Sequence, residues 1–119
     1  MKIQKKYIIF IILILFSMIL YQFRKESIFN EGIYIGTGEG YTSEIILKVE
    51  TDSRKILEIE VVSENENPEI GNIVYPLLIA DAKTNNGENI DVITGATLTS
   101  QGFIDALKEA LSKAKGLKE

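Results

Sequence analysis

The chain has 119 residues, with 13 basic and 17 acidic side chains, no cysteine and no histidine. This length accommodates one small domain, and the missing residue types exclude disulfides, thiol catalysis, and the commonest metal ligand and general base near neutral pH. Residues 1–25 contain five basic and no acidic side chains, whereas the other 94 residues contain eight basic and 17 acidic ones. The acidic part is not expected to bind nucleic acid, which requires a basic surface, and we expect no metal site.

The first predicted element is the apolar run YIIFIILILFSMILYQF at residues 7–23, which contains no charged side chain. As a helix it would span roughly 25 Å, the short end of what crosses a bilayer. A buried core helix is disfavoured because no polar residues recur to form a solvent-facing side. A cleaved signal peptide is disfavoured because no small-residue cleavage site follows the run. We therefore expect an uncleaved membrane anchor over residues 1–25, with a transmembrane helix at about 7–23, followed by a linker at 26–31.

The basic residues beside the apolar run predict its orientation. Three lysines precede the run, and Arg24 and Lys25 follow it, so the positive-inside rule favours a cytoplasmic N-terminus by a small margin. We expect a single-pass protein of the cell membrane whose acidic domain is extracytoplasmic.

The residues after the linker predict strands first. Residues 33–35 are expected to form a strand that runs into a glycine-rich turn at 36–40, where the G-x-G-x-G spacing differs from that of a dinucleotide loop. Residues 41–50 and 56–62 alternate apolar and polar side chains, which predicts two half-buried strands of a hairpin. The side chains expected on the buried side of the last strand are Leu57, Ile59 and Val61.

Two helices are expected after the strands. The polar segment 63–72 contains a proline and a glycine and is expected to be a loop, and a second proline suits the first turn of a helix over 76–83. Residues 90–93 predict a short extended stretch, and apolar spacing predicts a last helix over about 100–115. Its apolar face contains Phe103, Ile104, Leu107, Leu111 and Ala114. Strands followed by helices indicate an α+β domain over 32–119, a small antiparallel sheet with two helices, preceded by the one transmembrane helix.

Small and hydroxyl residues gather before the last predicted helix, in the string DVITGATLTS at 91–100. Thr99 or Ser100 can cap that helix while Gly95 makes the turn, but a cap accounts for one hydroxyl rather than four in seven residues. Alternatively, the N–H groups of a helix N-terminus and neighbouring hydroxyls favour a phosphate, and Gly95 and Ala96 leave room beside the backbone. The residues themselves leave both interpretations open.

The same string resembles the flavinylation signature D-x-x-[ST]-G-A-T-x-[ST]-[ST] of the FMN-binding domain family. That family includes the covalent-flavin subunits of the sodium-translocating NADH:quinone reductase and of the Rnf complex. The segment YIGTGEGY at 34–41, the strand residues 55–62 and the Ala-Leu pairs at 106–107 and 110–111 are also similar to the family's pattern. One loop departs from it: the family often has N-x-T-P-G-I-G where this chain has NENPEIG at 65–71.

The resemblance implies a covalent cofactor. In the family, the threonine of the tetrad S/T-G-A-T is esterified to the phosphate of FMN by a separate flavin transferase that uses FAD and Mg²⁺, and this threonine is Thr97 here. Self-modification is not expected because a threonine hydroxyl needs activation and the chain has no histidine to provide it. The other expected site residues, for transferase recognition, loop shape or phosphate contact, are Asp91, Thr94, Gly95, Ala96, Thr99 and Ser100. The glycines at 36, 38 and 40 are expected to let the hairpin twist or approach the flavin.

These observations predict a membrane-anchored flavoprotein that carries electrons from a membrane donor to an unknown acceptor. An independent enzyme is not expected, since a domain of about 85 residues around a flavin leaves little surface for a substrate pocket. A hydrolase or transferase is disfavoured because no acid–base pair or activated nucleophile can be assembled. The alternative is a non-redox anchored module, in which TGATLTS only caps the last helix and the acidic surface binds a basic partner.

Overall fold

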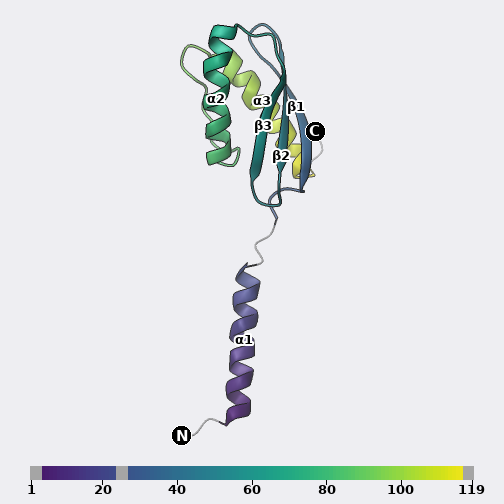
Figure 1. The fold of residues 1–119 in the computed structure, drawn as a ribbon, viewed down its shortest axis with the longest axis vertical. Helices are drawn as coiled ribbons and strands as arrows, with labels where there is room; N and C mark the ends of the chain where they lie inside the picture. The colour runs from purple at the N-terminus through teal and green to yellow at the C-terminus, as the bar shows by residue number, and fades with distance from the viewer. Residues whose placement is uncertain (1–3, 24–26, 117–119) are drawn as a thin grey trace.

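The computed structural model describes residues 4–23 and 27–116, which form an N-terminal helix and a small α+β domain (Figure 1). The elements in chain order are α1 (Lys5–Phe23), β1 (Gly32–Glu39), β2 (Glu44–Thr51), β3 (Ile56–Ser63), α2 (Pro68–Thr84) and α3 (Thr97–Ala114). The three strands make one antiparallel sheet in the order β1-β2-β3. The predicted fold class, a small antiparallel sheet with two helices preceded by an N-terminal apolar helix, is confirmed.

The helix α1 is apolar on all sides. Its residues from Lys5 to Gln22 are long and apolar enough to cross a membrane by length and composition, a test that a signal sequence also passes. Its side chains are exposed over this range, and α1 packs against none of the other described elements. Three of the five basic residues on which the predicted orientation depends, Lys2, Arg24 and Lys25, lie outside the described residues. Residues 117–119 of the predicted domain also lie outside them.

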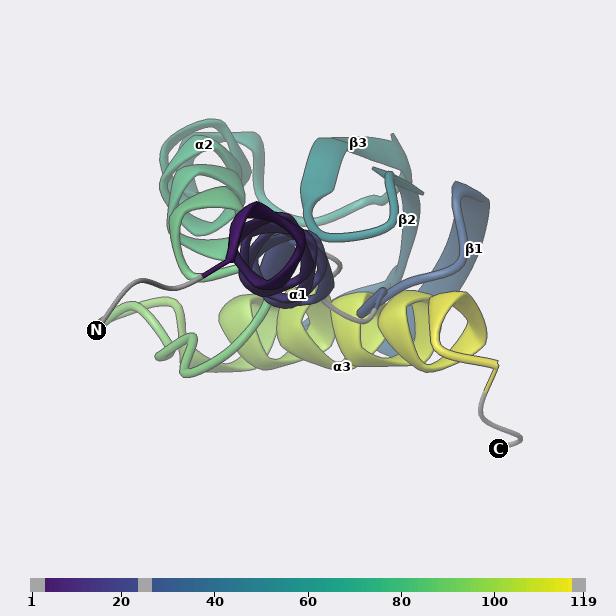
Figure 2. The ribbon, with the colours of Figure 1, turned by 90° about the horizontal axis from the view of Figure 1, so that it is seen from below.

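The core of the domain lies between the sheet and the two later helices. Figure 2 shows α3 running across one face of the sheet, with α2 beside β3. The side chains of Ile45, Leu47 and Val49 on the central strand are fully buried against this helical layer. All five apolar residues predicted for the buried face of α3 are buried. The 3.6-residue spacing in this segment therefore predicted the correct helix face.

The predicted glycine-rich turn is wrong, because β1 continues through the glycines to Glu39. A Cβ atom on Gly36 would lie 1.8 Å from the carbonyl oxygen of Ala106, and one on Gly38 would lie 2.0 Å from that of Gly102. The two glycines therefore allow the backbone of α3 to contact the backbone of β1. This packing role replaces the predicted hairpin twist for these two positions.

The strict alternation predicted for the second hairpin strand is also wrong. The pairing of β2 with β3 shifts register twice, between Ile46 and Leu47 and between Glu50 and Thr51. Leu57 is the extra residue at the second shift and is exposed, although the alternation placed it on the buried side. The bulge adds one residue, Leu57, to β3. The side chains after it therefore alternate again in the predicted order, and Ile59 is buried as predicted.

The structure differs from the prediction over most of the expected 63–72 loop and at the expected start of the next helix. α2 begins at Pro68, and the Asn67 side chain accepts a hydrogen bond from the Glu69 N–H at 3.0 Å, which caps the helix. An asparagine cap followed by proline at the first position is a favoured helix start. Pro76 lies inside α2 instead of beginning it, where burial of neighbours such as Leu78 maintains the helix.

The packed domain includes part of the segment expected to be a linker. Phe29 is only 2% exposed and belongs to the core. The Phe29 N–H donates to the Ser53 carbonyl at 3.1 Å, and the Asn30 N–H donates to the Ala114 carbonyl at 2.7 Å. These bonds attach the chain entering β1 to the β2–β3 turn and to the end of α3.

Candidate functional site

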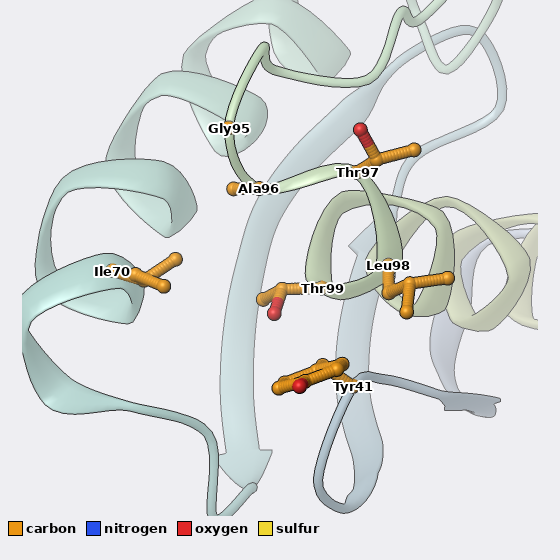
Figure 3. Close-up of a pocket in the computed structure, with 7 residues that line it drawn as sticks. All are labelled: Tyr41, Ile70, Gly95, Ala96, Thr97, Leu98 and Thr99. Carbon is orange, nitrogen blue, oxygen red and sulfur yellow. The ribbon is translucent and has the colours of Figure 1, made fainter.

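A cavity of about 350 Å³ lies between the β1–β2 turn, the first turn of α2 and the start of α3 (Figure 3). The residues that line it are Tyr41, Ile70, Gly95, Ala96, Thr97, Leu98 and Thr99. Its volume is at the lower end of the range for small-molecule sites. The lining combines the Tyr41 ring and aliphatic groups with two threonines, so one part suits an apolar ring system and another a polar group.

The start of α3 supplies the polar part of the cavity. This helix begins at Thr97, three residues before its predicted start, and Ala96 is the N-cap residue with no side-chain capping bond. Of the two interpretations left open by the sequence, a side-chain cap by Thr99 or Ser100 is therefore wrong. The Ser100 N–H makes a helical bond to the Ala96 carbonyl at 2.9 Å, so the N–H groups of Thr97, Leu98 and Thr99 precede the regular ladder. The positive end of the helix dipole lies at these groups.

Thr97 combines accessibility with this electrostatic setting. It is the first residue of α3, its side chain is exposed, and it forms part of the cavity wall. Within the described chain its hydroxyl makes no hydrogen bond to another side chain. This hydroxyl is accessible from solvent and lies where an anion is stabilised.

The loop before α3 is held by two hydrogen bonds. The Ala96 N–H donates to the Ile93 carbonyl at 2.9 Å, and the Ile93 N–H donates to the Ser100 hydroxyl at 3.0 Å. Gly95 has a φ of +87°, in the left-handed region, although a Cβ atom there would meet nothing within 4 Å. Backbone conformation rather than space therefore requires glycine at this position.

The structure brings together part of the predicted site. Four predicted residues line the cavity: Gly95, Ala96, Thr97 and Thr99. Ser100 is fully buried and holds the loop from inside. Asp91 and Thr94 are exposed and lie outside the cavity wall. Within the described ranges, no group of three or more acidic, histidine or cysteine side chains could hold a metal ion.

Sequence reasoning missed Glu66, which lies behind the cavity and is only 4% exposed. Its carboxylate accepts hydrogen bonds from the backbone N–H groups of Tyr41 and Thr42 and from the hydroxyls of Thr42, Ser43 and Thr99. Burial opposes ionisation of this carboxyl, but the bonds from Thr42, Tyr41 and Thr99 outweigh it and lower its pKa to about 2. Glu66 is therefore an anion at neutral pH.

Three residues of the cavity wall were also absent from the predicted site. Tyr41 is 70% exposed and Leu98 is 55% exposed, while Ile70 is half-buried on the first turn of α2. The available signals were an aromatic residue directly after the glycine run and an isoleucine after the Asn-Pro pair. For Glu66 no local signal existed, because it is one of three glutamates in the polar segment 64–69.

A family model and two relatives with known names match this chain. The family model described as "FMN-binding domain" matches residues 40–112. The chain is 37% identical over 94 residues to the NADH:acrylate oxidoreductase of Vibrio harveyi, a match that covers 76% of this chain and 9% of that protein. It is 29% identical over 85 residues to the urocanate reductase of Eggerthella lenta, covering 71% of this chain and 14% of that protein. The matched region is thus about a tenth of the length of these relatives.

Proposed function

This chain belongs to the FMN-binding domain family, and on that premise we propose that it is a membrane-anchored flavoprotein that holds FMN covalently on Thr97 and transfers electrons on the extracytoplasmic side. The observation that carries the proposal is the setting of the Thr97 hydroxyl. It is exposed, it belongs to the cavity wall, and it lies on the first residue of α3.

The residues present fit FMN. The N–H groups at the start of α3 suit a phosphate, and this end of the cavity also carries the Thr97 hydroxyl, while the Thr99 hydroxyl donates to Glu66. The Tyr41 ring and the aliphatic groups of Ile70 and Leu98 suit a flat aromatic ring system. FMN would supply the redox chemistry, while the chain provides attachment, shape and electrostatic surroundings.

Attachment requires an outside enzyme. Oγ of Thr97 forms a bond to the FMN phosphorus of FAD, the phosphoanhydride bond breaks so that AMP leaves, and the hydroxyl proton passes to solvent. The chain has no histidine or cysteine that could activate this hydroxyl, so we assign activation to a flavin transferase with Mg²⁺. Asp91 and Thr94 are exposed beside the attachment point and are proposed as contacts for this transferase. The resulting phosphodiester keeps a negative charge that the start of α3 stabilises.

The chain is proposed as a carrier between redox partners rather than an independent enzyme. The two relatives are named as an oxidoreductase and a reductase, and this chain matches only about a tenth of each. A membrane donor and an extracytoplasmic acceptor would then provide the remaining chemistry, with α1 keeping the carrier at the bilayer. A non-redox module in which the hydroxyls of TGATLTS only cap α3 is not proposed, because the N-cap residue is Ala96 and no side chain makes a capping bond there.

The test is intact-mass spectrometry of the full chain after co-expression with a flavin transferase. We expect a mass increase of one FMN unit and visible flavin absorbance, and Thr97→Ala should lose both completely. Thr84→Ala is the matched control, since Thr84 is an exposed threonine at the end of α2, outside the cavity. An unmodified Thr97 in native membranes, or flavin retained by Thr97→Ala, would overturn the proposal.

A further inference from the structure

Three walls of the cavity converge on one buried carboxylate. Glu66 immediately precedes Asn67, the cap of α2, whose first turn carries Ile70. Its carboxylate also accepts from the backbone of Tyr41 in the β1–β2 turn and from the hydroxyl of Thr99 in α3. Glu66 does not line the cavity itself. It therefore connects the walls from behind.

Each carboxylate oxygen of Glu66 has its own set of donors. Oε1 accepts from the Tyr41 N–H and, at 3.0 Å, from the Thr99 hydroxyl. Oε2 accepts from the Thr42 N–H at 2.8 Å, from the Thr42 hydroxyl, and from the Ser43 hydroxyl at 3.2 Å. A hydroxyl can rotate to accept instead of donating, but a backbone N–H cannot. Since each oxygen receives one backbone N–H, both atoms must be acceptors.

The burial of Glu66 makes these bonds obligatory. A buried carboxylate without partners is costly, whereas hydrogen bonds to an ionised acceptor are stronger than those between neutral groups. In the part of the chain that the structure describes, no buried side-chain polar atom lacks a hydrogen-bond partner, and both carboxylate oxygens of Glu66 are therefore hydrogen-bonded. Removing the carboxylate would leave the N–H groups of Tyr41 and Thr42 without their acceptor.

We propose that Glu66 is a positioning residue for the flavin site: by holding the Tyr41 turn and the Thr99 hydroxyl to one carboxylate, it sets the separation of the cavity walls and so the surroundings of the bound flavin ring. This inference rests on the proposed function. It adds a role for a residue outside the signature at 91–100, at a distance of 33 residues in the chain from Thr99.

The decisive comparison is between two conservative variants. Glu66→Gln keeps the volume but replaces one acceptor oxygen with an NH₂ group, which would face a backbone N–H. Glu66→Asp keeps both acceptors and the charge on a side chain one methylene shorter. If the carboxylate positions the walls, the amide exchange, flavin spectrum and midpoint potential of Glu66→Asp stay closer to the wild-type values than those of Glu66→Gln. If the side chain only fills space, Glu66→Gln stays closer. Glu69→Gln removes the same charge from an exposed position three residues away and is the control.

The experiment uses the full chain in lipid nanodiscs, with and without attached FMN. Without flavin, we expect Glu66→Gln to raise hydrogen exchange at the amides of Tyr41 and Thr42 by about tenfold or more, as for the loss of a buried acceptor. With flavin, we expect altered visible circular dichroism and a shifted midpoint potential in Glu66→Gln, a smaller change in Glu66→Asp and none in Glu69→Gln.

Thr99→Val keeps the inference testable if the Glu66 variants do not fold. This substitution removes only the hydroxyl that connects α3 to Glu66, so the amides of Tyr41 and Thr42 should stay protected while the flavin spectrum changes. An unchanged flavin spectrum and potential in Thr99→Val and Glu66→Gln would overturn the positioning role, even if stability falls.

If wild-type Thr97 carries no FMN, the proposed function fails. The exchange measurement without flavin then decides by itself whether Glu66 holds the walls.

Discussion

The two threonines of the first turn of α3 have opposite surroundings. Thr97 is exposed, whereas Thr99 is 4% exposed and donates to Glu66. Residues two apart on a helix lie on nearly opposite sides, so one turn presents one hydroxyl to solvent and the other to the interior. We infer a division of roles in which Thr97 is available for modification and Thr99 fixes the helix start from which Thr97 projects.

The ionisation of Glu66 makes the stability of the domain sensitive to acid. Its ordinary pKa of about 4.5 is lowered in the folded state to about 2. Between these values the unfolded chain binds a proton that the folded chain does not, so the folded state loses stability as the pH falls. The contribution of Glu66 is therefore complete above about pH 4.5 and disappears as the pH approaches 2.

We expect Glu66→Gln to flatten this pH dependence. The variant should have a lower free energy of unfolding at pH 7, by about 1 to 3 kcal/mol for a buried donor left without its acceptor. Between pH 4.5 and 2 its free energy of unfolding should fall by less than that of the wild type. Asp52 and Glu109, whose pKa values are also lowered, are present in both proteins and cancel in the comparison. Urea unfolding at a series of pH values provides the measurement, and parallel curves for the two proteins would contradict the expectation.

At the scale of elements, the contact between β1 and α3 determines where the cavity forms. Gly38 faces Gly102 on α3, and a Cβ atom on Gly102 would in turn lie 2.7 Å from the backbone of Gly40. Glycine on both sides brings the helix and strand backbones together. Tyr41 follows directly after this contact, so the close approach brings the β1–β2 turn beside the first turn of α3.

Gly38→Ala should therefore destabilise the domain and disturb the site. The added methyl group would lie 2.0 Å from the Gly102 carbonyl oxygen, which forces α3 away from β1. We expect the free energy of unfolding to fall by at least about 2 kcal/mol, as for overpacking in a rigid core. Glu39→Ala, an exposed position on the same strand, should change it by less than about 0.5 kcal/mol. Urea unfolding followed by near-ultraviolet circular dichroism measures both, and equal stability would refute the tight-contact interpretation.

At the scale of the whole molecule, charge and apolar character divide the chain into two parts. Residues 1–25 are basic and contain the apolar helix α1, whereas the other 94 residues carry all 17 acidic side chains. An acidic domain is repelled by anionic lipid headgroups, so α1 rather than the domain surface is the proposed membrane attachment. A covalently held cofactor also suits a domain outside the cytoplasm, where a dissociated one would be diluted.

The absence of cysteine allows a direct test of sidedness, because one introduced thiol is unique in the chain. On intact cells, we expect a membrane-impermeant maleimide to label Lys108→Cys in the domain but to label Gln4→Cys only after permeabilisation. Both positions are exposed, so reactivity reports location rather than burial. Labelling of Gln4→Cys alone on intact cells would reverse the proposed orientation.

Local patterns in the sequence were sufficient for features that depend on neighbouring residues. The spacing of Phe103, Leu107 and Leu111 predicted the buried face of α3, and the string at 91–100 pointed to the family. Local patterns failed where two possible helix starts competed. The Asn67-Pro68 pair starts α2, but we assigned the helix start to Pro76.

Only the tertiary structure determined how the site is assembled. Glu66 meets Tyr41 across 25 residues and Thr99 across 33, and Gly38 meets Gly102 across 64. Such contacts leave no periodic trace, because hydrophobic period and turn chemistry describe residues within a few positions of one another. The sequence alone therefore specified the family, the candidate anchor and the predicted attachment threonine. Folding specified the cavity and the buried carboxylate behind it, because both exist only where the three segments pack together.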